Sequence, residues 1–275
     1  MNEKTIAFIG GGNMARSLIG GLIADRHPAA GLRVAEPDGN RREALIADFE
    51  VQAFQENATA IRGADVVILA VKPDRIAPVV RELAAQIRAQ GTLVVSIAAG
   101  VRCADIDGWL GGDSPVVRAM PNTPALVQTG ATALFANASV DEAQRNLAET
   151  ILRAVGMVVW LSDEQDMNTV TAISGSGPAY FFLTMEAMQT AGESMGLDAR
   201  TAHLLTLETA LGAARMALES ADDVGDLKRR VTSPGGTTAA ALNELESGDL
   251  AGLYRRALSA AARRADELGR ELGDQ

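Results

Sequence analysis

The sequence contains few of the residues that carry out catalysis without a cofactor. Its 275 residues include one cysteine, Cys103, and two histidines. A single cysteine excludes an internal disulfide framework and fits a reducing compartment, so we expect a cytoplasmic protein. Zinc sites are built mostly from cysteine and histidine, so we expect no metal centre. Catalysis should therefore depend on an organic cofactor, on hydroxyl groups or on ordered water.

Long apolar runs and excess positive charge are missing as well. No apolar run approaches the ~20 residues of a membrane-spanning helix, and the chain begins with a predicted strand rather than with a signal-peptide pattern. The formal net charge of −10 argues against nucleic acid or an anionic membrane as a partner. Because 47% of the residues are hydrophobic, the chain can bury a substantial core, in one large domain or two smaller ones.

The N-terminal stretch places a strand, a glycine turn and a helix in direct succession. Residues 5–9 are apolar and largely β-branched, Gly10, Gly11 and Gly12 follow, and apolar residues then recur at helical spacing. This order is the start of a βαβ dinucleotide-binding unit, in the form of the fingerprint that ends in alanine, here Ala15. We expect Gly10 to allow a sharp turn and Gly12 to let a pyrophosphate approach the backbone, facing the first N–H groups of the helix.

The end of the second predicted strand gives conflicting indications about the cofactor. Residues 32–35 form this strand and Glu36 follows it, roughly 20 residues beyond the glycines, as the dinucleotide fold requires. A carboxylate there suits the 2′-hydroxyl of NAD and repels the 2′-phosphate of NADP. Asn40, Arg41 and Arg42 lie just beyond and could pair with that phosphate, or form a solvated helix face. Both cofactors therefore stay open.

Strands and helices alternate over the first half of the chain. Near-continuous apolar runs are typical of parallel strands buried on both faces, and amphipathic segments between them predict helices. The predicted strands are 5–9, 32–35, 65–71, 92–97, 115–120, 130–136 and 157–161, and the predicted helices are 40–48, 76–89 and 141–155. This alternation predicts a doubly wound, mostly parallel sheet.

Three predicted strand ends carry unusual residues. They are Ala70-Val-Lys-Pro73, Ala98-Ala-Gly100 and Met120-Pro-Asn-Thr-Pro124. Ligands of such sheets bind at the carboxyl ends of the strands, so three such ends at one edge predict a site. Small residues at the first two ends leave room for a flat ring, and the two prolines of the third restrict the backbone around Asn122.

The pattern changes near residue 162. Beyond it, alanine-rich segments with helical periodicity replace the strands, at 181–195, 199–218, 238–245 and 250–272. We therefore expect an α/β Rossmann domain over residues 1–162 and an all-α helical domain over residues 163–275. The helical half carries more apolar side chains than a domain of its size can bury alone, so we expect a homodimer at least.

Two hydroxyl-rich segments stand out in the helical half. Ser174-Gly-Ser-Gly-Pro-Ala-Tyr180 and Thr232-Ser-Pro-Gly-Gly-Thr-Thr238 each precede a predicted helix. We expect both to be helix N-termini that present free N–H groups and hydroxyls to a carboxylate, with Pro178 in a first turn. Helix capping would explain either segment alone. Two of them beside a dinucleotide domain favour a small anionic substrate.

In this combination and order, the motifs resemble those of the pyrroline-5-carboxylate reductase family over nearly the whole chain. The matching segments are Phe8-Ile-Gly-Gly-Gly-Asn-Met14, Ala70-Val-Lys-Pro73, Val95-Ser-Ile-Ala-Ala-Gly100, Met120-Pro-Asn-Thr-Pro124 and the two hydroxyl-rich segments. The resemblance implies a Rossmann domain, a helical dimerisation domain, and dimers that in many members form a ring. It implies the last step of proline biosynthesis, hydride transfer from NAD(P)H to the C=N bond of 1-pyrroline-5-carboxylate. NADP(H) would be the cofactor, with NAD(H) as the alternative.

The resemblance also implies roles for single residues. The loop at 233–238 would hold the substrate carboxylate, and Thr238, as the catalytic residue, would hydrogen-bond or relay a proton to the ring nitrogen. The expected substrate-binding residues are Glu164, Ser176, Ser233, Gly235, Gly236, Thr237 and Thr238. The expected cofactor-binding residues are Ile9, Gly10, Gly11, Gly12, Asn13, Met14, Glu36, Asn57, Ala70, Val71, Lys72, Pro73, Ala98, Ala99 and Asn122.

Three alternatives stay open at the level of the sequence. An imine reductase for another cyclic imine acid would use the same hydride chemistry. A 3-hydroxyacid dehydrogenase of the 6-phosphogluconate type shares the architecture, but such enzymes use a lysine on a helix of the second domain, and no lysine occurs between Lys72 and Lys228. A non-catalytic, dinucleotide-sensing dimer would keep the glycine loop but has no need for both hydroxyl-rich segments.

Overall fold

A computed structural model of the chain describes residues 4–273. Its contacts divide the chain into two compact units, one comprising Met1–Ser176 with Ala260–Gln275 and the other Gly177–Ser259. The sequence places the domain boundary after residue 162, whereas the contacts divide the chain after Ser176. The boundary at residue 162 therefore stays a prediction.

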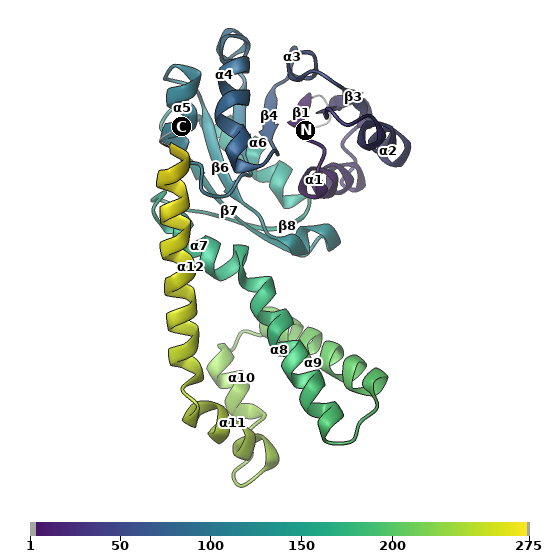
Figure 1. The fold of residues 1–275 in the computed structure, drawn as a ribbon, viewed down its shortest axis with the longest axis vertical. Coiled ribbons are helices and arrows are strands. Elements are labelled where there is room, and N and C mark those ends of the chain that lie inside the picture. The colour runs from purple at the N-terminus through teal and green to yellow at the C-terminus, as the bar shows by residue number, and fades with distance from the viewer. Residues whose placement is uncertain (1–3, 274–275) are drawn as a thin grey trace. The chain divides into compact units, whose positions relative to one another are not determined.

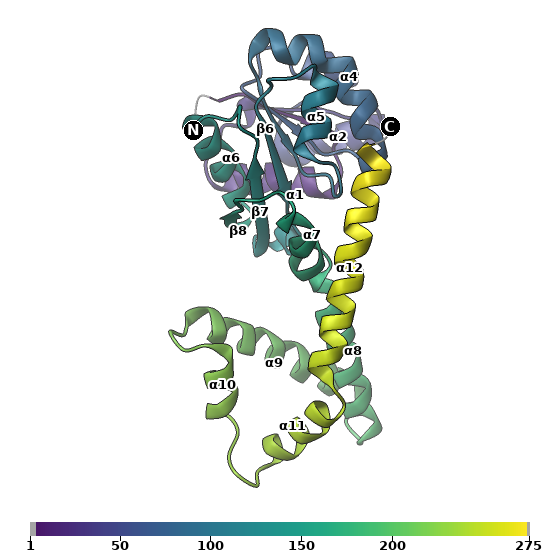
Figure 2. The ribbon, with the colours of Figure 1, turned by 90° about the vertical axis from the view of Figure 1, so that its left-hand side faces the viewer.

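The first unit is built around one eight-stranded sheet with the order β3-β2-β1-β4-β5-β6-β7-β8 (Figures 1 and 2). Neighbouring strands are parallel except β6 and β7, which are antiparallel. The doubly wound, mostly parallel sheet predicted from the alternation is confirmed. The strands are β1 (Ile6–Ile9), β2 (Leu32–Ala35), β3 (Gln52–Phe54), β4 (Val66–Leu69), β5 (Leu93–Ser96), β6 (Val116–Met120), β7 (Gly130–Ala136) and β8 (Gly156–Trp160). The short, partly exposed β3 has no counterpart among the predicted strand ranges.

Helices cover both faces of this sheet. α1 (Asn13–Ala24), α2 (Gly39–Phe49) and α6 (Glu142–Arg153) pack on one face, and α3 (Asn57–Ala60), α4 (Pro73–Gln90) and α5 (Cys103–Leu110) pack on the other. Alternate residues of β1 serve the two cores, since Ile6 and Phe8 belong to the first and Ala7 and Ile9 to the second. Burial on both faces explains why the central strands are continuously apolar.

The helix ends of this unit follow from local chemistry. α4 begins with Pro73, whose missing N–H costs nothing in a first turn, and its C-cap is Gly91 at φ +63°. α6 begins with a capping box, in which Asp141 accepts the N–H of Gln144 at 2.7 Å and the Gln144 side chain accepts the N–H of Asp141 at 3.1 Å. Such caps define where the connecting loops begin.

The transition from strands to helices runs through successive helical turns. α7 (Asp166–Val170) passes into a π-helical turn (Thr171–Gly175), and α8 (Gly177–Ser194) follows. The last part of α12 (Leu250–Gly273) returns to the first unit, where Leu272 packs against the core under α4 and α5.

The second unit is wholly helical and buries very little. It contains α8, α9 (Ala199–Glu219), α10 (Val224–Arg230), α11 (Thr237–Ser247) and the start of α12, with α8 and α9 packed side by side (Figures 1 and 2). Within residues 177–259, all of which the structure describes, the buried residues are Gly177, Ala202, Thr206 and Gly252. None of these is a large apolar residue, so this unit has no core of its own. Neither α7 nor α10 has a counterpart among the predicted helices.

Within residues 4–273, none of the helices combines the length and the apolar character needed to cross a lipid bilayer.

Candidate active site

The strand ends that the sequence singles out lie at one edge of the sheet. In the strand register Ile9 is paired with Ala35 and with Leu69, and Leu69 is paired with Ser96. The loops that follow these residues therefore leave the sheet together, on either side of the point between β1 and β4 where the strand order reverses. This is the place where open α/β sheets bind ligands. The predicted gathering of these loops is confirmed.

The glycine loop has the geometry that the fingerprint predicts. Gly10 has φ +100°, and a Cβ there would lie 2.7 Å from the carbonyl oxygen of Ala70. Gly12 is the N-cap of α1; no described side chain caps the helix there, and an added Cβ would meet nothing within 4 Å. The first N–H groups of α1 therefore face open space that an anion can enter. These features fit a dinucleotide pyrophosphate.

Glu36 is more deeply engaged than a surface carboxylate. The residue is 5% exposed, its Oε2 accepts the N–H of Gly11 at 3.0 Å and its Oε1 accepts the N–H of Asp38 at 3.0 Å. Nearby, Nη1 of Arg42 donates to the carbonyl oxygens of Glu36 at 2.7 Å and Pro37 at 2.8 Å. Arg42 is thus anchored to the turn between β2 and α2, whereas Arg41 has an exposed side chain.

The predicted ring-binding residues lie on the next two strand ends. Lys72 is the N-cap of α4, with an exposed side chain that makes no capping bond among the described residues. Ala98 is buried, Ala99 is exposed and Gly100 has φ +81°. These small residues leave the edge of the sheet free of bulky side chains.

Two predicted cofactor contacts have side chains that are engaged elsewhere. Nδ2 of Asn122 donates to the carbonyl oxygen of Ser174 at 3.1 Å, and its Oδ1 accepts the N–H of Ala131 at 2.9 Å. Asn57 is the first residue of α3, and its Nδ2 donates to Glu82 at 3.3 Å. Asn122 therefore fastens the loop after β6, and cofactor contacts of both residues stay predictions.

Glu164 joins an ion pair that the sequence analysis missed. Its Oε1 accepts from Nη1 of Arg118 at 2.9 Å and from the N–H of Cys103 at 2.9 Å. Arg118, on β6, is 4% exposed; the signal was an arginine inside an otherwise apolar strand. A carboxylate at residue 164 would be favourable at the start of a helix, but α7 starts at Asp166. The negative charge instead lies at the N-terminus of α5, where it is favourable.

Cys103 has a structural role at the same place. It is the first residue of α5 and is buried, and burial, followed by the nearby Glu164 charge, raises the pKa of its thiol far above the ordinary value. A thiol held neutral in this way is a poor nucleophile.

The first hydroxyl-rich segment agrees with the prediction in part, because α8 begins at Gly177 and Pro178 lies in its first turn. We expected a helix N-terminus with free N–H groups, but Ser174 and Gly175 lie in the π-helical turn, and the N–H of Ser176 donates to the carbonyl oxygen of Thr171 at 2.8 Å. The Ser174 hydroxyl donates to the carbonyl oxygen of Val170 at 3.1 Å. Helical hydrogen bonding thus continues where the glycines suggested a break. π-Helical turns are rare and occur frequently at functional sites.

The second hydroxyl-rich segment is a helix N-terminus, as expected. Gly235 has φ +71°, and Gly236 is the N-cap of α11 with no capping side chain from the described residues. The first turn of α11 contains no acidic residue. The N–H groups of this turn and the hydroxyls of Thr237 and Thr238 are therefore suited to a carboxylate. This loop belongs to the second unit.

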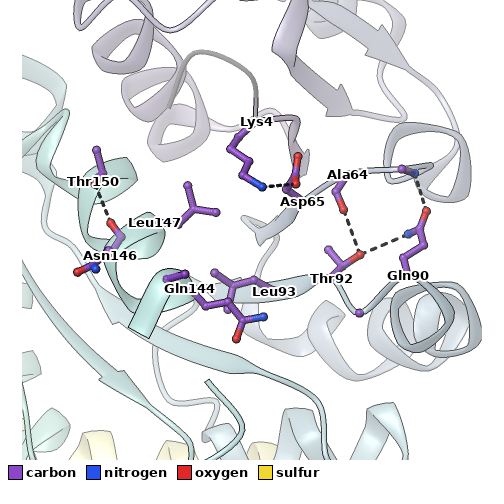
Figure 3. Close-up of a pocket in the computed structure, with 13 residues that line it drawn as sticks. Lys4, Ala64, Asp65, Gln90, Thr92, Leu93, Gln144, Asn146, Leu147 and Thr150 are labelled. Atoms are coloured by element: carbon purple, nitrogen blue, oxygen red, sulfur yellow. Dashed lines mark hydrogen bonds and ion pairs between the residues drawn. The ribbon is translucent and has the colours of Figure 1, made fainter. Parts of the chain in front are cut away.

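A cavity of about 650 Å³ lies at the opposite edge of the sheet (Figure 3). Lys4, Asp65 and Thr92 at its wall precede β1, β4 and β5, at the amino ends of those strands. Nζ of Lys4 lies 2.8 Å from Oδ1 of Asp65, and the Thr92 hydroxyl donates to the carbonyl oxygen of Ala64 at 3.1 Å. These polar groups bond to one another, so we interpret the cavity as a packing gap at the amino ends of the strands and not as the candidate site.

Metal ligands do not gather at either edge. Within residues 4–273 there is no group of three or more histidine, cysteine, aspartate or glutamate side chains placed to hold a metal ion.

Comparison with known proteins identifies the family. The family model described as pyrroline-5-carboxylate reductase dimerisation matches residues 164–268, and the model described as NADP oxidoreductase, coenzyme F420-dependent, matches residues 5–100. The pyrroline-5-carboxylate reductase of Pseudomonas aeruginosa is 50% identical over 273 residues, which cover 99% of this chain and 100% of that protein. The chain belongs to the pyrroline-5-carboxylate reductase family.

Solved structures of this family have the same fold. The pyrroline-5-carboxylate reductase of Coxiella burnetii superimposes with a TM-score of 0.94 at 50% identity, covering 97% of this chain and 99% of that one. The Plasmodium falciparum enzyme with NADP bound gives 0.87 at 28% identity, covering 98% and 99%. The predicted Rossmann domain with a helical dimerisation domain is confirmed, and so is an NAD(P)H-dependent oxidoreductase that makes proline.

Proposed function

We propose that this chain reduces 1-pyrroline-5-carboxylate to L-proline with a reduced nicotinamide dinucleotide bound at the glycine loop. One observation carries the proposal: in a chain of this family, the glycines Gly12 and Gly236 are the N-caps of α1 and α11, and no described side chain caps either helix. The first suits a pyrophosphate and the second a small carboxylate.

The reaction needs little from ionisable side chains. The bound nicotinamide supplies a hydride to the carbon of the C=N bond. The ring nitrogen carries a proton and keeps it as the double bond becomes a single bond, so one hydride and one proton are added in total. A protonated imine is already electrophilic, and the chain therefore contributes by binding and orienting the two reactants and excluding water. This explains how a protein with two histidines can do the chemistry.

Cofactor binding is assigned to the carboxyl edge of the sheet. The glycine loop and the first residues of α1, from Ile9 to Met14, would hold the phosphates through their N–H groups. Ala70, Val71, Ala98 and Ala99 would leave space for the nicotinamide ring. The backbone of Lys72 and Pro73, with Asn57 and Asn122, completes the proposed set.

Substrate binding is assigned to the loop at 233–238 together with Ser176. The N–H groups at the start of α11 would hold the carboxylate, and the hydroxyl of Thr238 would hydrogen-bond to the ring nitrogen and relay to it the proton that the nitrogen then keeps. Glu164 has one oxygen committed to Arg118 and Cys103. Its other oxygen would contact the substrate amine.

Assembly and compartment extend the proposal. Phe181, Phe182 and Leu211 are more than half exposed on a unit without a core, which supports an obligate homodimer through the matched dimerisation segment. We further propose that dimers associate into a ring and that the protein works in the cytoplasm. Light scattering of the purified protein at micromolar concentration tests the assembly, and a monomer would contradict it.

Turnover with a defined substrate tests the function. The loss of reduced nicotinamide is followed with NADH and with NADPH, each with and without 1-pyrroline-5-carboxylate, and L-proline is measured by mass spectrometry. We expect substrate-dependent oxidation with proline as the product. A six-membered cyclic imine acid run in parallel distinguishes another imine reductase. A folded dimer that binds the cofactor yet reduces neither imine would contradict the proposal and favour a sensor.

A further inference from the structure

We propose that Glu36 positions the glycine loop and turns the cofactor preference of this chain toward NADH. The proposal rests on the proposed function only in assuming that a nicotinamide dinucleotide binds at the glycine loop. It concerns a choice that the family resemblance leaves open.

The carboxylate of Glu36 is held in place from several directions. It accepts the buried N–H of Gly11 and the N–H of Asp38, both at 3.0 Å. The backbone N–H of Glu36 donates to the carbonyl oxygen of Phe54 at 2.9 Å, and its own carbonyl oxygen accepts from Arg42. Rotating the side chain away would leave the Gly11 N–H without its partner inside the protein, which is costly. The carboxylate therefore cannot move aside easily when a ligand arrives.

Through the same contacts, Glu36 connects the glycine loop to the turn between β2 and α2. Gly11 lies in the middle of the glycine loop, and Asp38 is the N-cap of α2. A Cβ on Gly11 would lie 2.6 Å from Cδ1 of Leu45 and 3.3 Å from Oε2 of Glu36, so the loop packs tightly against α2 and this carboxylate. Removing the carboxylate should loosen the glycine loop for either cofactor.

The unused hydrogen-bond acceptor sites of the Glu36 carboxylate and its negative charge discriminate between NADH and NADPH. A carboxylate has about four lone-pair sites, and the two N–H bonds leave sites for the hydroxyl of a ribose at the end of β2. A 2′-phosphate has no hydrogen to donate in its charged form and meets a fixed negative charge instead. Because Glu36 is 5% exposed, solvent and salt screen this repulsion weakly.

The neighbouring cations do not reverse this balance. Nη1 of Arg42 is occupied by two backbone carbonyl oxygens. The side chain of Arg41 is exposed, and its backbone N–H donates to Oδ1 of Asp38, a second carboxylate on the same turn. An exposed guanidinium is screened more strongly than a buried carboxylate, so the negative charge dominates at this turn.

Equilibrium binding to the whole protein tests the proposal without turnover. NADH and NADPH are titrated separately, with no imine present, and their fluorescence gives the two Kd values. We expect wild type to bind NADH about tenfold more tightly than NADPH. Glu36→Gln should weaken NADH binding and shift the ratio of Kd values about tenfold toward NADPH. Glu36→Ser, which removes the side chain beyond Oγ, should shift the ratio in the same direction.

A matched control and an exchange measurement separate the two parts of the proposal. Glu43→Gln makes the same chemical change at an exposed position of α2 and should leave the ratio unchanged. Faster amide exchange at Gly11 in Glu36→Ser, which removes the acceptor of its N–H, would support the positioning role, and unchanged exchange would contradict it. Tighter binding of NADPH by wild type, or an unchanged ratio in both Glu36 variants, would overturn the selectivity. Failure of imine turnover would count against the proposed function and leave these binding results untouched.

Discussion

Thr238 is the residue whose hydroxyl the proposed chemistry uses most directly. It is half-buried at the start of α11. Thr238→Ala should lower kcat about 100-fold, the usual size of a lost proton-transfer contact, with little change in melting temperature. Steady-state kinetics and thermal unfolding measure the two effects. Thr238→Ser, which keeps the hydroxyl, should recover most of the loss, and full activity of Thr238→Ala would sink the assignment.

Glu164 pairs with buried Arg118, and we propose that it also contacts the substrate; a Glu164→Gln variant tests both roles. Its removal leaves the buried Arg118 guanidinium without an ionic partner, so we expect Glu164→Gln to lose about 2 kcal/mol of stability. Loss of the proposed contact with the substrate amine should also raise the KM for the imine. Urea unfolding and steady-state kinetics measure the two quantities. Unchanged stability would contradict the structural role, and an unchanged KM would contradict the substrate contact.

His27 makes stability depend on pH. It is 3% exposed, and burial lowers its pKa below the usual 6.5. The neutral form is favoured in the folded state, so the unfolded state takes up its proton first as the pH falls. The stability that this histidine contributes is present above pH 6.5 and is lost below it.

The test compares unfolding across this pH window. Between about pH 7.5 and 5.5 the free energy of unfolding should fall, with a slope of at most about 1.4 kcal/mol per pH unit for one proton. His27→Leu should flatten this part of the curve at the same protein concentration. An identical slope in the variant would assign the effect to other groups.

At the scale of elements, α12 fastens the loop after β5. A Cβ on Gly269 of α12 would lie 3.1 Å from the carbonyl oxygen of Gly100, and Leu272 is in contact range of the same glycine. Gly269→Ala should therefore push the loop at 98–100 and raise the Kd of the cofactor several-fold. The gain in helix propensity, up to about 1 kcal/mol, should largely preserve stability.

Gly108→Ala is the matched control for that change. Gly108 lies in α5, and a Cβ there would meet nothing within 4 Å. This variant should gain about 0.5–1 kcal/mol and bind the cofactor as wild type does. Equal cofactor affinity of both variants would show that α12 does not position the loop.

At the scale of the whole molecule, dimerisation should decide whether the helical unit is stable. A groove of about 840 Å³ between α8 and α9 is lined by Phe182, Leu183, Met185 and Leu207, among others. Phe182 is 63% exposed. A second copy would bury this surface, so the free energy of unfolding should rise with protein concentration.

Phe182→Glu places a charge where we expect the partner. Sedimentation velocity should show dissociation or unfolding, with loss of turnover. Ala44→Glu, on the exposed face of α2 in the first unit, introduces the same charge and should stay dimeric. A dimeric, active Phe182→Glu protein would move the interface elsewhere.

Local patterns were sufficient for much of the fold and part of the candidate site. The predicted strands 32–35 and 130–136 coincide with β2 and β7. Gly10 and Gly236 lie where the glycine patterns predict a turn and a helix start. Three-residue β3 and seven-residue α10 carry too few periods for a pattern to emerge. The π-helical turn at 171–175 was not predicted because glycine and serine favour a break, whereas Asn122, distant in the sequence, donates to the carbonyl oxygen of Ser174 within this turn.

The sequence by itself determined the alternation of elements, the glycine loop and the uncapped start of α11. Each depends on residues close together in the chain, on periodicity and on the conformational freedom of glycine. Only the tertiary structure decided what the buried polar groups hold: Glu36 reaches Gly11 across 25 positions, and Arg118 reaches Glu164 across 46. Such pairs exist because the sheet brings distant segments together, where burial makes an unpaired charge costly. No local sequence pattern shows which distant residue will pair with a buried charged side chain.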